Sequence, residues 1–213
     1  MTGRGPLSLR FLAAREGASL WSSVAAGCPT RFAEGVMHMV QALRLESSLA
    51  TILGQDAPAM PTVDTTAVSL LDISHKALAS MSLAEDRAGF VIGVLAARSV
   101  AGATLALSDF HRSLGQRLAS ATTKADDRRR QFYDVTTLLS HPTQVVDSST
   151  GLEVPTVSLA EVDCARGIAD EVTTTTDGVT DASVLSTLSS LVATHLVRGL
   201  DLGYPPLDSA LLS

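Results

Sequence analysis

Hydrophobic residues recur every three or four positions over two long stretches of the chain, which is the spacing of an amphipathic α-helix. Between Thr30 and Gly54 the apolar positions include Phe32, Val36, Met39, Val40 and Leu43. Between about 181 and 198 they are Val184, Leu185, Leu188, Leu191 and Val192, with His195 on the same side. Gly199 then supplies a helix stop. The pattern predicts two long helices that each bury one face.

Less regular versions of the pattern predict further helices. Three of them cover residues 8–24, 65–81 and 159–172. A fourth begins at 82 and continues through the apolar run 88–107. A fifth covers 108–121 or, after a break, extends to 140. Proline and glycine interrupt the chain at 55–61 and again at 143–155. The predicted fold is therefore mainly α: a multi-helix bundle with a buried central helix, irregular terminal arms and a short loop or hairpin around 143–157.

This organisation predicts a single helical domain over residues 1–213. Its parts in chain order are an N-terminal arm and short helix (1–29), a helical core (30–140), a loop (141–157), C-terminal helices (158–199) and a tail (200–213).

The tetrapeptide Ser-Leu-Ala-Glu occurs twice, at 82–85 and at 158–161. A serine followed three residues later by glutamate is typical of a capping box, in which each side chain accepts a hydrogen bond from a backbone N–H of the first helical turn. The flanking residues do not match. We therefore interpret the two occurrences as two helix starts and not as an internal repeat.

The stretch from Ala88 to Leu107 is the most apolar in the chain, with Arg98 as its only charged residue. It has the length of a membrane span, and Gly89 and Gly93 are spaced for close helix contact. However, Arg98 would lie near the middle of the bilayer, where a charge costs a few kcal/mol. We predict a helix buried in a bundle and no membrane span.

Composition narrows the classes of function. Hydrophobic residues make up 46% of the chain and charged residues 18%, which excludes a wholly disordered protein. Aromatic residues supply only 4%, so there are few platforms on which bases or sugars could stack. The two cysteines, Cys28 and Cys164, have no metal-ligand spacing and are expected to be reduced and buried. Arg10 and Arg15 interrupt any secretory signal, so we expect a cytoplasmic protein or one within a particle assembled inside the cell.

Charge is distributed unevenly along the chain. Residues 1–131 hold 14 basic and 11 acidic residues, a balance of +3, whereas residues 132–213 hold 2 basic and 11 acidic residues, a balance of −9; together they give the net −6. A bipolar subunit of this kind could bind copies of itself head to tail or hold a polyanion on one face. The alternative is that the acidic half is simply a solvated surface.

No motif for a known chemistry is present. The chain lacks the glycine-rich nucleotide motifs, the G-x-S-x-G nucleophile elbow and H-E-x-x-H. Its five histidines are scattered and never stand four apart. Two of them could meet in space, but nothing in the sequence indicates which. The sequence therefore predicts no catalytic residue, no metal ligand and no cofactor.

The strongest polar feature is a basic segment with aromatic residues directly after it at 132 and 133. Its cations, which we expect to contact a polyanion or an acidic partner, are Arg112, Arg117, Lys124, Arg128, Arg129 and Arg130. The function that we predict is that of a self-assembling structural subunit: a coat, shell or accessory capsid-type protein such as viruses use. Its partners would be itself and, in addition, nucleic acid or an acidic protein. Two alternatives stay open: a helical regulatory or adaptor module, and an enzyme whose site is dispersed in the sequence.

Overall fold

The computed structural model describes residues 6–123, 126–174 and 181–206, and it confirms a mainly helical fold. The elements in chain order are α1 (Leu7–Gly27), a 3₁₀ turn η1 (Pro29–Arg31), α2 (Phe32–Leu53), α3 (Thr65–Ser69), α4 (His75–Ala97), α5 (Leu105–Ser120), α6 (Thr136–Ser140), β1 (Gln144–Val146), β2 (Glu153–Pro155), α7 (Thr156–Thr174) and α8 (Ala182–Asp201). The expected terminal arms lie mostly outside the described residues.

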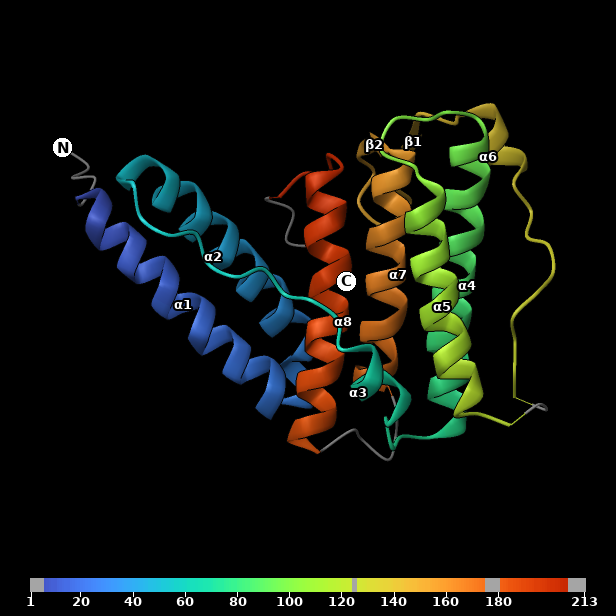
Figure 1. Ribbon diagram of the computed structural model, residues 1–213, viewed down its shortest axis with the longest axis horizontal. Helices are drawn as coiled ribbons and strands as arrows, with labels where there is room; N and C mark the ends of the chain where they lie inside the picture. The colour runs from blue at the N-terminus through green and yellow to red at the C-terminus, as the bar shows by residue number, and fades with distance from the viewer. Residues whose placement is uncertain (1–5, 124–125, 175–180, 207–213) are drawn as a thin grey trace.

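Four of these helices, α4, α5, α7 and α8, run side by side as a bundle (Figure 1). Two helical hairpins build it: α4 packs along α5, α7 packs along α8, and α4 and α7 join the pairs. The interior is filled by fully buried aliphatic side chains, among them Leu78, Leu114, Ile168 and Leu188. A bundle of amphipathic helices buries its apolar stripes in this way.

The N-terminal helices α1 and α2 form a third hairpin, which is inclined to the bundle and contacts it mainly through α8 and also through α7 (Figure 1). Gly35 lets the two helices cross closely, because a Cβ at this position would lie 2.7 Å from the backbone nitrogen of Ala25. Phe32 and Val36 are fully buried beside the crossing, as the apolar spacing of α2 predicted.

The predicted buried central helix is α4. Between residues 77 and 96 of this helix only Arg87 is exposed. The helix nevertheless ends at Ala97 and does not continue to 107 as expected. Ser99 and Gly102 have φ angles of 57° and 84°, which reverse the chain, and the Thr104 hydroxyl caps α5. Among the described helices none is long and apolar enough to cross a membrane.

Both predicted capping boxes are wrong. Helix α4 begins at His75 and is capped by Ser74, so Ser82 lies inside it and donates a hydrogen bond to the Gly115 carbonyl (2.7 Å). Helix α7 begins at Thr156, two residues before the second tetrapeptide. The expected helix over 65–81 is likewise interrupted after α3. In both tetrapeptides the glutamate faces the bundle interior and not the helix end.

The connection between α5 and α7 is mostly irregular. Among its described residues, 122–123 and 126–155, α6 is the only helix. The hairpin expected around 143–157 is confirmed: β1 and β2 pair antiparallel, with Val145 opposite Val154.

Candidate metal centre in the four-helix bundle

Four ionisable side chains meet at the centre of the bundle, one from each helix. They are Glu85 from α4, His111 from α5, Glu161 from α7 and His195 from α8, and all four have no solvent exposure. The Glu85 carboxylate lies 2.7 Å from His111 Nδ1 and 2.9 Å from His195 Nε2. The Glu161 carboxylate lies 2.9 Å from His195 Nδ1 and 3.2 Å from His111 Nε2. Each carboxylate therefore bridges the two imidazoles.

The cluster has an approximate two-fold symmetry. Each histidine directs Nδ1 to the glutamate of its own hairpin and Nε2 to the glutamate of the other hairpin. The two rings are stacked, with centroids 4.8 Å apart and planes inclined by 17°. Neither hairpin holds the complete cluster, so the site exists only where the two hairpins pack together.

The symmetry extends to the sequence and to the helix contacts. In each hairpin Ser-Leu-Ala-Glu on the first helix is followed by His-x-x-x-Gly on the second, at 111–115 and at 195–199. A Cβ on Gly115 would lie 3.2 Å from the Ser82 carbonyl oxygen, and a Cβ on Gly199 would lie 3.3 Å from that of Ser158. These glycines bring the histidine helix close to the glutamate helix. The bundle thus contains an internal repeat, contrary to our interpretation of the sequence.

Cys164 breaks the symmetry. It lies one helical turn after Glu161, at the position where the other hairpin has Ala88, and it is buried. One ligand atom each from Glu85, His111, Cys164 and His195 lie within 4.8 Å of one another. A thiol is therefore added to the two imidazoles and the carboxylates.

The charges of the cluster stabilise one another. Burial alone would raise the pKa of Glu85, but the two histidines lower it to about 2. Burial would likewise raise the pKa of Glu161, and the same histidines lower it to about 2. Burial would lower the pKa of His111 and His195, but contacts with Cys164 and with the two carboxylates raise the pKa of both well above the ordinary value. Without a metal ion these directions favour charged carboxylates and charged imidazoles, whose charges offset one another.

Burial of these four ionisable groups costs free energy in the folded state. Charged groups lose several kcal/mol of hydration on burial, and well-packed apolar residues often stabilise a core as well or better. The pairing is also imperfect: His111 Nε2 and Glu161 Oε1 lie 3.2 Å apart as an ion pair, but neither atom forms a well-aligned hydrogen bond within the described part of the chain. A buried cluster of this cost points to a chemical role. Imidazole nitrogens, a thiol and a carboxylate are the ligands that zinc takes in proteins, and the donor set fits such an ion.

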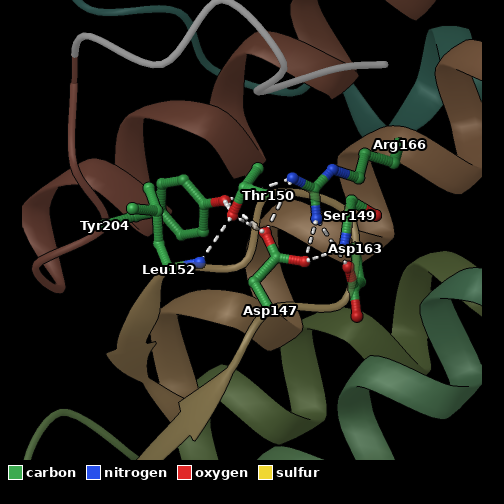
Figure 2. Close-up of polar contacts among 7 residues, drawn as sticks. All are labelled: Asp147, Ser149, Thr150, Leu152, Asp163, Arg166 and Tyr204. Atoms are coloured by element: carbon green, nitrogen blue, oxygen red, sulfur yellow. Dashed lines mark hydrogen bonds and ion pairs between the residues drawn. The ribbon is translucent and has the colours of Figure 1, made fainter.

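A second buried polar cluster lies at the end of the bundle near the hairpin (Figure 2). The Asp147 carboxylate accepts hydrogen bonds from Arg166 Nη1 and Nη2 (3.2 and 2.9 Å), and Tyr204 donates its hydroxyl proton to the same carboxylate. Arg166 also pairs with Asp163, whose side chain is 58% exposed. This cluster joins the β1–β2 turn, α7 and the segment after α8, which is a structural role.

The structure brings three of the predicted basic contact residues together at one cavity. Arg112, Arg129 and Arg130 line a common cavity beside α4 and α5. Arg117 donates to the Ser69 hydroxyl, and Arg128 contacts Ser80, both outside that cavity. Lys124 lies outside the described residues.

Sequence reasoning missed the residues of the central cluster because they are spread over 110 positions. A usable signal was present: Ser-Leu-Ala-Glu followed by His-x-x-x-Gly, twice in one chain. Comparison of the chain with protein-family models, curated proteins and solved structures finds no match. The arrangement of the buried side chains is therefore the basis for the function proposed below.

Proposed function

We propose that this protein is a metal-binding helical bundle that holds one divalent transition-metal ion, with zinc as the best-fitting ion, between its two central hairpins. The observation that carries the proposal is the convergence of two histidines, a cysteine and a glutamate at one fully buried point. Metal sites of bundle proteins are built in this way, from side chains on facing helices.

The contacts assign a role to each side chain. Glu85 faces His111 Nδ1 and His195 Nε2, so these two nitrogens, Cys164 Sγ and a Glu85 oxygen would be the four ligands. Glu161 faces the other nitrogen of each histidine and would hold both rings in the required tautomer. A tetrahedral zinc ion places its ligand atoms about 3.3–3.8 Å apart. The ligand atoms that lie up to 4.8 Å apart would need to approach by about 1 Å, and the Glu85 carboxylate, now 2.7 and 2.9 Å from the two nitrogens, would need to move away from them.

Four protein ligands leave no coordination position for a substrate, which is the pattern of structural zinc sites. The ion would link α4 and α5 to α7 and α8 and would stabilise the native state by mass action. The proposed role is therefore to lock the two hairpins together.

Chelator-treated protein is expected to bind about one Zn²⁺ per chain and to unfold at a higher temperature when zinc is added, since the ion binds only the assembled bundle. Substitution of Cys164 by alanine should weaken binding at least about 100-fold, because loss of an outer-shell partner alone costs about 10–100-fold. Titration calorimetry with zinc and thermal unfolding measure the two effects.

The matched control is Cys28→Ala, which removes the other cysteine, a half-buried residue that is not part of the cluster. It should bind zinc as the wild type does. If the wild type binds no zinc, or if the Cys28 and Cys164 variants bind it equally, the cluster is a metal-free network of charges and the proposal is wrong.

Self-assembly is a second candidate function, favoured by one feature of α1. The helix buries Phe11, Ala14 and Ala18 on one side. On the opposite side Leu9, Leu12 and Leu20 are 59%, 55% and 58% exposed, with the exposed Glu16 between Leu12 and Leu20. Large leucine side chains exposed on one side of a helix often mark contact with a partner. We propose that a second copy of the chain covers this stripe, in the assembly that the charge distribution favours.

Light scattering of the wild type should then give a mass above that of one chain, and serine at positions 9, 12 and 20 should reduce it to a monomer without unfolding it. The control replaces two leucines that are equally exposed but lie elsewhere, Leu70 and Leu105. A wild-type monomer at all concentrations and salt levels would exclude self-assembly of this chain.

A further inference from the structure

A cavity of about 280 Å³ lies on the outer side of α4 and α5, beneath the irregular segment that follows α5. We call it the basic cavity. Its walls include three arginines, one aspartate and one aromatic ring: Arg112, Arg129, Arg130, Asp86 and Phe90. It is distinct from the central cluster, because Arg112 and His111 are successive residues of α5 and have opposite environments, exposed and fully buried.

The position of Arg112 is set by the sequence of α4. Its Cγ would lie 2.9 Å from a Cβ on Gly89, and its Nη2 would lie 3.7 Å from a Cβ on Gly93. The two glycines therefore leave a groove along α4 in which the arginine side chain lies. The spacing of Gly89 and Gly93, which is also typical of helix contacts in membranes, here makes room for the Arg112 side chain.

Arg129 attaches the irregular segment to the bundle. It donates to Gln116 on α5 (2.8 Å) and forms two bonds with Asp127 (3.0 and 2.8 Å). The hydrogen bonds with Asp127 raise the pKa of the Arg129 guanidinium and outweigh burial, which would lower it. The group is therefore charged. Tyr133 fixes the segment at a second point, by donating to Asp86 on α4 (2.6 Å). Hydrogen bonds from Arg129 and Tyr133 thus hold the irregular segment against α4 and α5, where it forms one wall of the cavity.

The two other arginines carry the available charge. Neither the Arg112 nor the Arg130 guanidinium has a hydrogen bond or ion pair with another residue of the described ranges 6–123, 126–174 and 181–206. Two guanidinium groups beside a cavity favour an anion that accepts several hydrogen bonds, and phosphate oxygens match their planar geometry.

We propose that the basic cavity binds a small phosphate ester, with its phosphate between Arg112 and Arg130 and its organic part against Phe90. Tyr133 packs edge-on against that ring, at 5.3 Å between centroids and 61° between planes, and supports it as an aromatic wall. A partly open cavity of about 280 Å³ has room for a terminal phosphate and a small organic group. The net charge of −6 opposes binding of a polyanion by the chain as a whole.

The test uses titration calorimetry at low and moderate salt with three probes: inorganic phosphate, phenyl phosphate and a single-stranded oligothymidylate. Wild-type protein should bind phenyl phosphate more tightly than inorganic phosphate. The double variant Arg112→Gln/Arg130→Gln should bind inorganic phosphate and phenyl phosphate at least about tenfold more weakly, because it removes the two guanidinium groups that would donate hydrogen bonds to the phosphate.

The control is Arg117→Gln/Arg128→Gln, which changes the net charge equally but leaves the cavity intact. It should bind phenyl phosphate as the wild type does. The proposal is overturned by absence of phosphate binding to the wild type, by equal losses in the two double variants, or by tighter binding of the oligonucleotide than of phenyl phosphate. Zinc binding should be unchanged in both variants, so this test and that of the metal centre can fail separately.

Discussion

Substitution of His195 by leucine is expected to lower the free energy of unfolding by about 3–5 kcal/mol, the usual cost of removing one partner from a buried group of charges. The reason is the bridging position of this imidazole between the two carboxylates, 2.9 Å from Glu85 and 2.9 Å from Glu161. Without it, two fully buried carboxylates share a single imidazolium. Urea unfolding at pH 7 in the presence of a chelator measures the loss without a contribution from metal.

The informative comparison is with a variant in which Glu85, His111, Glu161 and His195 are all replaced by leucine. Removal of a complete buried charge network is often neutral or stabilising, by up to about 4 kcal/mol, so this variant should match or exceed the wild type in chelator. It should bind no zinc. A single His195→Leu change that costs less than about 1 kcal/mol would contradict the described pairing.

Replacement of Asp147 by asparagine should cost about 3 kcal/mol at pH 7, because it leaves the Arg166 guanidinium in a buried site without its main carboxylate. In this cluster burial would raise the pKa of Asp147, but hydrogen bonds from Arg166 and Tyr204 lower it to about 2 (Figure 2). The effect should therefore depend on pH in a defined direction.

A carboxyl whose pKa is lower in the folded than in the unfolded protein stabilises the fold above its unfolded pKa, near 4, and loses that contribution as the pH falls. The difference in stability between wild type and Asp147→Asn should thus be full above about pH 4. It should shrink by about 2 kcal/mol as the pH falls toward 2. Chemical unfolding at a series of pH values measures this difference.

Asp163 offers a matched control for Asp147. It pairs with the same arginine at 3.0 Å, but its side chain is 58% exposed. Ion pairs in contact with water contribute about 0–1 kcal/mol, so Asp163→Asn should have a small effect. Equal losses in the two variants would mean that burial of the Asp147 pair does not determine its strength.

The helices were largely predictable because apolar periodicity reports which face of a segment is buried. Helix α2 and helix α8 follow their predicted stripes closely, and the β1–β2 hairpin falls where proline and glycine interrupt the pattern. Errors arose where a local signal competed with tertiary structure. Ser82 and Ser158 resemble helix caps in sequence, but each lies inside its helix and is fully buried.

The central cluster could not be derived from linear spacing, since its four helices each contribute one or two residues. His111 and His195 are 84 positions apart and become neighbours only when the two hairpins pack. The repeated Ser-Leu-Ala-Glu with His-x-x-x-Gly indicated two equivalent hairpins, and symmetry would then have placed the two histidines together. The flanking sequences concealed this, because the residues around the two tetrapeptides do not match.

The absorption fine structure at the zinc K-edge tests the metal centre most directly, using Cys28→Ala protein in which Cys164 is the remaining thiol. The predicted first shell is one sulfur at about 2.3 Å and three nitrogen or oxygen atoms at about 2.0–2.1 Å, with outer-shell scattering from two imidazoles. A shell of oxygen and nitrogen alone would mean that zinc binds elsewhere, and the bundle core would then hold only its four paired charges.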